Sequence, residues 1–483
     1  MSLLRDLRCQ LTHIKLDGDI ICEQHASRTL LPFITQLQFL KHLELSDDNS
    51  RLARRDETSY TVGDFESIHV ACTQLERLDI SGLSISMGVH DSILSMDFTQ
   101  VSAAKNMRIF NLRDVDLDDD QCIGYFLFKY PQLDELGWYS DARYFDVEYF
   151  HDNLYMAIAK QYRQLKKLHL DGINVAYWPG QTFFDILNEH GTQLQCLHID
   201  TPLDLSQPEF SAMMKSIRHT ISDLQLIIEH AQDIVHLWQS LGQCQHLVRL
   251  KIVNRTYSTL DISLILSHCR YLQILSLIEG FAVAPAVRPS RHGLLKLELV
   301  SVILDVTYIA SYLSDHCPRL ESLVLLTCYD HSSSERAVNI YAPHHIFKTI
   351  SITQLGRIRT ENTGVIFGND VVIVSITQIK EWDSNKQKSS EQTGCKREHN
   401  QKTRWYYLHD SVPYSDKTPV VYRLDKEAIR HMIQFPSLST AEHVDGSSRG
   451  RKKWKKHADS GYIDIVCKTV DNLLINGANI QAC

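Results

Sequence analysis

The sequence lacks the features that mark membrane and secreted proteins. It has no apolar run of about 18 residues, so we expect no membrane-spanning helix. Its first ten residues, MSLLRDLRCQ, include Arg5, Asp6 and Arg8, which interrupt the apolar stretch that a secretory signal needs. The 12 cysteines are widely scattered, which in a chain without a signal indicates free thiols in a reducing compartment. We therefore expect a protein of the cytosol or nucleus.

The sequence also lacks the short motifs of familiar catalytic sites. It contains no Gly-x-Ser-x-Gly elbow, P-loop, His-Glu-x-x-His helix or Gly-x-Gly-x-x-Gly turn. Its 24 histidines form no recognisable catalytic pattern. The sequence thus predicts no enzyme, no catalytic residue and no cofactor.

The composition is that of a folded protein of ordinary charge. Of the 483 residues, 43% are hydrophobic and 22% are charged, so disorder is not expected. The net charge of -8 gives no reason to expect nucleic acid as a partner.

The strongest positive signal is an internal repeat of the pattern Leu-x-x-Leu-x-Leu. Clear copies start at Leu40, Leu75, Met107, Leu133, Leu165, Leu194, Ile221, Leu247, Leu272, Leu294 and Leu320, and weaker copies start at Leu11 and Phe347. The mean period of about 28 residues lies within the range of leucine-rich repeats.

The spacing predicts the structure of each copy. Its central x-Leu-x triplet alternates outward, inward and outward, as a short strand does. The intervening segments Thr182 to Leu194 and Asp261 to Leu272 have apolar residues three and four apart, which is typical of helices. Stacked copies would share one core and pair their strands in parallel. The predicted fold is an α/β leucine-rich-repeat solenoid, a horseshoe with strands on its concave face.

Four copies carry a cysteine three residues before the first leucine of the motif. The clearest is CPRLESLVLLTC, from Cys317 to Cys328, and the others begin at Cys72, Cys244 and Cys269. These copies resemble the cysteine-containing, ribonuclease-inhibitor-like repeats of the F-box/leucine-rich-repeat family over about residues 9–355. The resemblance implies a module that recognises substrates for a cullin-based ubiquitin ligase, with ligase subunits as further partners.

One feature of that family has no recognisable counterpart in this sequence. Members that recruit the ligase carry a helical F-box, usually before the repeats, whereas the first weak repeat here starts at Leu11. The segment Leu30 to Leu40 has a Leu-Pro and a helical apolar period, but it leads directly into a strand motif and is interpreted as part of an ordinary repeat. A scaffold or interaction protein with no ligase role is therefore the alternative function.

Three groups of residues contain possible metal ligands, and the sequence favours a metal site at none of them. Cys72, Cys244, Cys269 and Cys317 occur one per repeat and are expected to fill equivalent points of the core. Cys395 and His399 have no second pair of ligands nearby, so the sequence predicts no metal site. The acidic run Asp116, Asp118, Asp119 and Asp120 is expected at a turn and helix N-terminus, where carboxylates favour the helix dipole, and not at a cation site.

The register of the repeats predicts which side chains project from the concave face. They include the predicted protein-binding residues Arg77, Lys167, His169, His198, Arg249 and Lys251. Most of these lie in the middle copies and are expected to make the middle of the face basic, so an acidic or phosphorylated protein segment is the expected partner. The alternative is that they are merely solvated strand positions.

The repeat pattern stops at about residue 355, and residues 356–483 are predicted to form a β-rich cap. Strand-like runs occur at Val365 to Ile379, Trp405 to Asp410, Pro419 to Leu424 and Tyr462 to Val470. Polar loops are expected at about residues 383–403 and 437–461. Covering the last core layer of the solenoid is one role for this region, and a separate interaction domain is the other.

The second polar loop contains a basic segment around Trp454. Its cations are the candidate nuclear-localisation residues Arg449, Arg451, Lys452, Lys453, Lys455 and Lys456. Solvated charge without a targeting role is the alternative.

We expect residues 437–461, fused to a cytosolic fluorescent reporter, to concentrate that reporter in nuclei. Replacing the six cations by alanine should return it to an even distribution, which fluorescence microscopy measures. Equal nuclear fractions for the two fusions would remove the basis for a targeting role.

Overall fold

In the computed structural model, the described part of the chain comprises residues 10–17, 26–47, 59–88, 101–117, 120–139, 152–171, 180–202, 208–228, 234–256, 258–284, 291–331, 337–361, 364–367, 373–379, 401–409, 420–424, 426, 429 and 462–480. The chain divides into two compact units, residues 1–246 and 247–483, which are described separately.

The first unit is built from strands that pair in parallel, one per repeat. The strands are β1 (His13–Asp17), β2 (His42–Ser46), β4 (Arg77–Ser81), β6 (Ile109–Arg113), β8 (Glu135–Tyr139), β9 (Lys167–Asp171), β10 (Cys196–Pro202) and β11 (Asp223–Ile228). Each pairs with the next in this order. Short strands β3 (Ser59–Thr61), β5 (Ser84–Ser86) and β7 (Asp116–Leu117) form a second parallel ladder.

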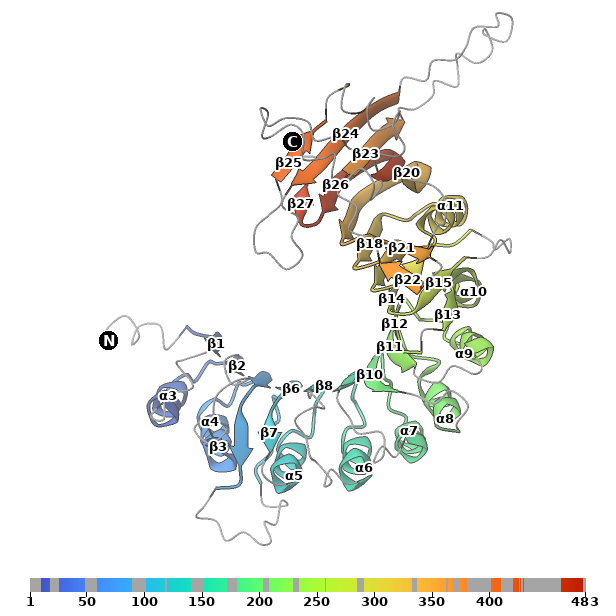
Figure 1. The fold of residues 1–483 in the computed structure, drawn as a ribbon. Coiled ribbons are helices and arrows are strands. Elements are labelled where there is room, and N and C mark those ends of the chain that lie inside the picture. The colour runs from blue at the N-terminus through green and yellow to red at the C-terminus, as the bar shows by residue number, and fades with distance from the viewer. Residues whose placement is uncertain are drawn as a thin grey trace, which may run out of the picture. The chain divides into compact units, whose positions relative to one another are not determined.

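Helices follow the strands and all lie on one side of this sheet (Figure 1). They are α3 (Ala26–Ile34), α4 (Val62–Ala71), α5 (Asp120–Lys129), α6 (Asp152–Gln161), α7 (Gly180–Glu189), α8 (Pro208–Ile217) and α9 (Ile234–Leu241). The opposite face of the sheet, which carries no helix among the described residues, is called the strand face, and the same name is used for the corresponding face of the main sheet in the second unit.

The second unit continues the same pattern. Strands β12 (Arg249–Asn254), β14 (Ile274–Ile278), β16 (Lys296–Val300), β18 (Ser322–Leu326) and β20 (Ala337–Thr353) pair in parallel. Helices α10 (Ile262–His268) and α11 (Val306–His316) lie between strands of this series. A second ladder joins β13 (Thr259–Asp261), β15 (Phe281–Val283), β17 (Ile303–Leu304), β19 (Tyr329–Asp330) and β21 (Gly356–Glu361), and β21 pairs with antiparallel β22 (Gly364–Phe367).

The β-rich end of the chain extends the main sheet of the second unit. Strand β26 (Tyr462–Ile475) pairs in parallel with β20 and with β23 (Ile373–Ile379). Antiparallel pairs then add β24 (Gln401–His409) and β25 (Val420–Arg423), and β27 (Ala478–Asn479) turns back on β26. Strands therefore occur in all four predicted runs, but β24 begins at Gln401, inside the expected first loop.

The core is built from the inward side chains of the strands, which align in rows from repeat to repeat. The central row of the first unit is Leu43, Leu78, Phe110, Leu136, Leu168, Leu197 and Leu224, each exposed by 3% or less. Burying each of these side chains stabilises the fold by roughly 1.5–3 kcal/mol before chain entropy is counted. Because the rows follow the predicted register, the fold is a leucine-rich-repeat α/β solenoid.

The four repeat cysteines lie in this core. Cys72, Cys244, Cys269 and Cys317 are all at most 4% exposed and form no disulfide. Cys72, Cys269 and Cys317 are the C-cap residues of α4, α10 and α11. Burial raises the pKa of Cys72 to about 11 and that of Cys317 to about 12, so both stay protonated at neutral pH.

Buried polar side chains complete the turns of the repeats. Asp330 is fully buried, and its carboxylate accepts a hydrogen bond of 3.0 Å from the backbone N–H of Val306, the first residue of α11. Asp305, the N-cap of the same helix, accepts from the N–H of Tyr308. Both partners would otherwise be unpaired donors of a helix start.

An aromatic cluster of the first unit surrounds His69. Phe65, Phe126 and Tyr130 pack with ring centroids 5.5 Å and 5.7 Å apart. Nε2 of His69 lies 2.6 Å from the hydroxyl of Tyr130. Burial, with a smaller effect from the charge of Lys129, lowers the pKa of His69 to about 3. The imidazole is therefore neutral at pH 7, and its tautomer decides whether Nε2 of His69 or the Tyr130 hydroxyl is the donor.

Several sequence predictions can be compared with these elements. The expected helices are α7 and α10, and the Leu-Pro segment forms the end of α3 and the turn before β2. Asp116 lies in β7 and Asp120 begins α5, whereas Asp118 and Asp119 lie outside the described residues. The second polar loop and its six cations also lie outside them. Among the described helices, none is long and apolar enough to cross a bilayer.

Lowering the pH should destabilise the first unit through His69. Its pKa is about 3 in the folded protein and 6.5 for an unperturbed histidine, so between these values the unfolded chain binds the extra proton and stability falls as pH falls. Going from pH 7.5 to 5.0 should cost about 2 kcal/mol through this residue alone. Urea denaturation should show a smaller loss for His69→Gln than for the unmodified protein; equal losses would contradict the assignment.

Removing the Asp330 carboxylate should destabilise the second unit. Asp330→Ala leaves the N–H of Val306 buried without this acceptor, at a cost of about 1–3 kcal/mol. Asp330→Asn keeps an acceptor oxygen and should lose less. The urea midpoints of the three proteins provide the comparison, and an unchanged midpoint for Asp330→Ala would contradict this role.

Candidate functional site

The strand face is the surface on which the predicted binding residues lie. Within a strand, successive side chains point to opposite sides of the sheet, so the residues flanking each buried leucine face away from the helices. Arg77 of β4, Lys167 and His169 of β9 and His198 of β10 occupy such positions in the first unit. Arg249 and Lys251 of β12 occupy them in the second. All six are less buried than the leucines between them.

At β2, β4 and β6 this face carries a hydrogen-bonded group centred on Asp79. Its carboxylate accepts from Nε of Arg77 at 2.6 Å and from Nδ2 of Asn111 at 2.6 Å. Nε2 of His42 lies 2.7 Å from the same carboxylate. Burial would raise the pKa of Asp79, but the hydrogen bonds from Arg77, Asn111 and His42 outweigh it and lower that pKa. Arg77 is thus held in place and its charge is balanced.

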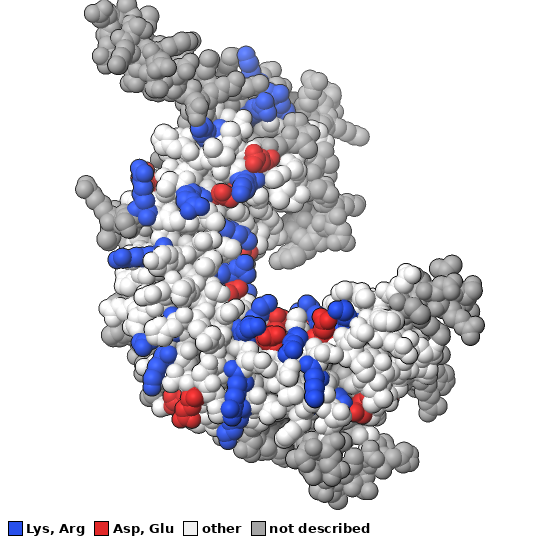
Figure 2. Space-filling model, turned by 180° about the vertical axis from the view of Figure 1, so that it is seen from behind, with Lys and Arg blue, Asp and Glu red and all other residues white. Residues whose placement is uncertain are grey.

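Ion pairs balance other cations of the strand face. Nζ of Lys167 lies 3.0 Å from Oε2 of Glu135, one strand away. Lys15 pairs with Glu44 at 2.7 Å, and in the second unit Lys296 pairs with Glu298 at 3.0 Å. Figure 2 shows acidic and basic side chains next to one another on the described surface. The strand face therefore alternates in charge, although sequence positions alone predicted a basic middle.

A second group, on β9, β10 and β11, contains histidine, cysteine and aspartate. Nδ1 of His169 lies 2.9 Å from Nδ1 of His198. The other ring nitrogen of His198 lies 3.4 Å from Sγ of Cys196 and 3.2 Å from Oδ1 of Asp223. The ring of His169 stacks on that of Tyr139, with centroids 5.9 Å apart. We call His169, Cys196, His198 and Asp223 the histidine–cysteine cluster.

The protonation state of His169 follows from the groups around its imidazole ring. Burial, and then the neighbouring His198, lower the pKa of His169 to about 4. The imidazole is therefore neutral at pH 7, and it contributes hydrogen bonding and a lone pair to the strand face, not a positive charge. The neutral state of His169 differs from the prediction that this residue adds positive charge to a basic surface.

The sequence pointed to two members of this cluster but did not predict that the four residues lie close together. It selected His169 and His198 as protein-binding residues, and Cys196 and Asp223 occupy other outward positions of the same repeats. Metal-ligand motifs are short runs along a chain, whereas these four residues come from three repeats. The signal was the alignment of the repeats, since the positions of Cys196 and His198 match those of Lys167 and His169.

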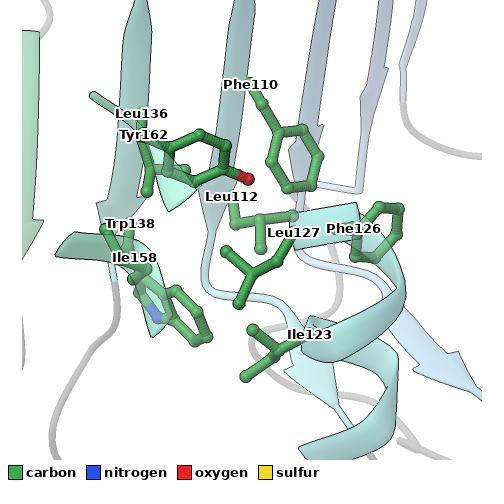
Figure 3. A pocket seen from close by; sticks show the side chains of 9 residues that line it. All are labelled: Phe110, Leu112, Ile123, Phe126, Leu127, Leu136, Trp138, Ile158 and Tyr162. Carbon is green, nitrogen blue, oxygen red and sulfur yellow. The ribbon is translucent and has the colours of Figure 1, made fainter. Parts of the chain in front are cut away.

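A small cavity lies inside the first unit, between α5, α6 and the strands β6 and β8 (Figure 3). Its volume is about 10 Å³, and its lining is Phe110, Leu112, Ile123, Phe126, Leu127, Leu136, Trp138, Ile158 and Tyr162. Such a space is barely enough for one water, which would need polar partners. The cavity is a packing gap of the core and not a ligand site.

Comparisons with known proteins give one similarity to a solved structure. No protein-family model matches the sequence, and no curated protein matches it. Among solved structures, the chain is similar to the crystal structure of an internalin from Listeria monocytogenes, with 14% identity and a TM-score of 0.36. That similarity covers 73% of this chain and 84% of the internalin. The assignment to the leucine-rich-repeat fold therefore rests on the aligned strands and buried leucine rows described above.

Proposed function

We propose that this chain is a protein-binding module and that the strand face is its binding surface. The observation that carries the proposal is the separation of roles within each strand. Inward residues are fully buried and fix the backbone, while outward residues such as Arg77, Lys167 and His198 are polar and partly exposed. A rigid sheet that presents varied polar groups over many repeats suits recognition of another protein.

The charge pattern of this face indicates the kind of partner. Because Arg77 and Lys167 already have carboxylate partners, a purely acidic segment would have to compete with Asp79 and Glu135. A partner with both acidic and basic groups can pair with both members of each ion pair. In the second unit, Arg249 and Lys251 add two cations to β12, and an acidic or phosphorylated segment is the partner proposed for them.

For the cellular role we propose substrate recognition for a ubiquitin ligase. The support is the resemblance of the cysteine-containing repeats to ribonuclease-inhibitor-like repeats of the F-box/leucine-rich-repeat family. The C-cap positions of Cys72, Cys269 and Cys317 give those cysteines one common structural role. In this proposal the protein acts in the cytosol or nucleus, and residues 356–483 cap the repeats. A scaffold that uses the same face without a ligase is the second candidate.

Reversing charge on the strand face should weaken partner capture. We expect Lys167→Glu, Arg249→Glu and Lys251→Glu together to reduce recovery of specific partners at least about tenfold, because charge-assisted hydrogen bonds contribute roughly 1.5–3 kcal/mol each. The measurement is affinity purification of the full chain after cross-linking in cells, with quantitative mass spectrometry of the recovered proteins.

The matched control reverses three exposed cations away from the strand face, at Lys160, Arg163 and Arg270. This control should recover the same partners as the unmodified protein, and circular dichroism should show that both variants are folded. Equal recovery by the two triple variants would argue against the strand face. Cullin and its linker protein among the recovered proteins would support the ligase role, and their consistent absence would favour the scaffold.

A further inference from the structure

The histidine–cysteine cluster brings metal-binding groups together from three neighbouring repeats. His169 lies on β9, Cys196 and His198 on β10, and Asp223 on β11. One ligand atom from each of His169, Cys196 and His198 lies within 4.8 Å of the other two. Elsewhere in the described part of the chain, no other three such side chains approach one another in this way.

The parallel register explains why these residues meet. His198 stands directly opposite His169, and Cys196 stands opposite Asp223 on the other side. Cys196 and His198 are two residues apart, so both face away from the helices. Neighbouring strands lie about 4.8 Å apart, which is close enough for side chains of adjacent strands to bind the same metal ion. The arrangement is therefore fixed by the backbone of the repeats.

The distances are close to those that a metal ion requires. Tetrahedral zinc, with bonds of about 2.0–2.3 Å, separates two nitrogen ligands by about 3.3 Å and a nitrogen from a sulfur by about 3.6 Å. The two Nδ1 atoms of His169 and His198 are 2.9 Å apart, and one ligand atom from each of His169, Cys196 and His198 lies within 4.8 Å of the other two. The shorter distance of 3.4 Å from Sγ of Cys196 is to the other ring nitrogen of His198, and an imidazole gives one ion only one of its two nitrogens. Bringing the most widely separated pair of ligand atoms, up to 4.8 Å apart, to the separation found around zinc takes a side-chain shift of about 1 Å.

The types of ligand select the metal. Calcium and magnesium prefer sites made only of oxygen atoms. A thiolate with two imidazoles suits zinc and related transition ions, and a carboxylate can complete four ligands. We propose that His169, Cys196 and His198 form a zinc-binding site on the strand face, with Asp223 on the neighbouring strand β11 as the candidate fourth ligand.

The surroundings of the cluster suit a metal site. Cys196 is 7% exposed and takes part in no disulfide, so its sulfur is shielded yet available as a ligand. The side chains of His198 and Asp223 are 27% and 19% exposed, which leaves a path for the ion from the strand face. The ring of Tyr139 stacks on His169 and limits its rotation, and the guanidinium of Arg113 lies 5.2 Å from the centroid of that tyrosine ring. The site goes beyond the proposed protein binding and does not depend on it.

Cobalt is the probe for the test, because Co²⁺ takes zinc sites and reports its ligands by absorption. The full chain, reduced and freed of metal with a chelator, is titrated with Co²⁺. We expect saturation at one equivalent, with visible bands of tetrahedral cobalt and a near-ultraviolet band from a thiolate ligand. One equivalent of Zn²⁺ should remove all of these bands.

Variants assign the bands to the cluster. Cys196→Ser should abolish the thiolate band and weaken Co²⁺ binding at least tenfold, and His198→Asn should weaken it to a similar extent. The matched controls are Cys269→Ala, which removes a buried core thiol, and His219→Ala, which removes an exposed histidine. Both controls should titrate like the unmodified protein.

The outcomes separate a metal site from a hydrogen-bonded cluster only. No thiolate band in the unmodified protein would overturn the proposal, whether or not the variants fold. A band that survives in Cys196→Ser, as folded as the parent by circular dichroism, would also overturn it. Thermal unfolding gives a second readout, in which Zn²⁺ raises the midpoint of the unmodified protein and of the controls but not that of the cluster variants.

Discussion

The structure depends on one constraint, the alignment of inward leucines from repeat to repeat. A strand has a side-chain period of two, so a slip of one residue would turn a whole row of leucines to solvent. The rows through Leu168 and through Leu297 show no such slip, and each member pairs with its counterpart on the next strand. The same alignment decides which residues appear on the strand face and how close they come to one another.

Most of the fold follows from the sequence because this constraint is periodic. The spacing of Leu-x-x-Leu-x-Leu located the strands of the main sheet from β2 to β18, and the cysteines before four of the motifs proved to be buried core residues. The short second ladders, such as β3, β5 and β7, were not predicted. Their two or three residues carry no period of their own, and their pairing depends on turns that the repeats bring together.

The candidate site was harder to predict than the fold, for two physical reasons. First, the charge of a face depends on pairs. Lys167 looks like part of a basic surface until Glu135, from the preceding repeat, is found 3.0 Å away. Second, the state of a side chain depends on burial. His169 reads as a cationic or titrating residue in the sequence, but its partly buried place beside His198 keeps it neutral. Neither the ion pair of Lys167 nor the burial of His169 can be predicted from the residues adjacent to them in the sequence.

The histidine–cysteine cluster takes its members from β9, β10 and β11 and from no other part of the chain. In a solenoid each repeat contacts chiefly its neighbours. Copies could therefore be gained or lost on either side of this triplet during evolution while the cluster persisted, whereas one copy inserted within it would separate the ligands by a full strand. The cluster thus requires these three copies to remain adjacent, whatever the number of copies on either side of them.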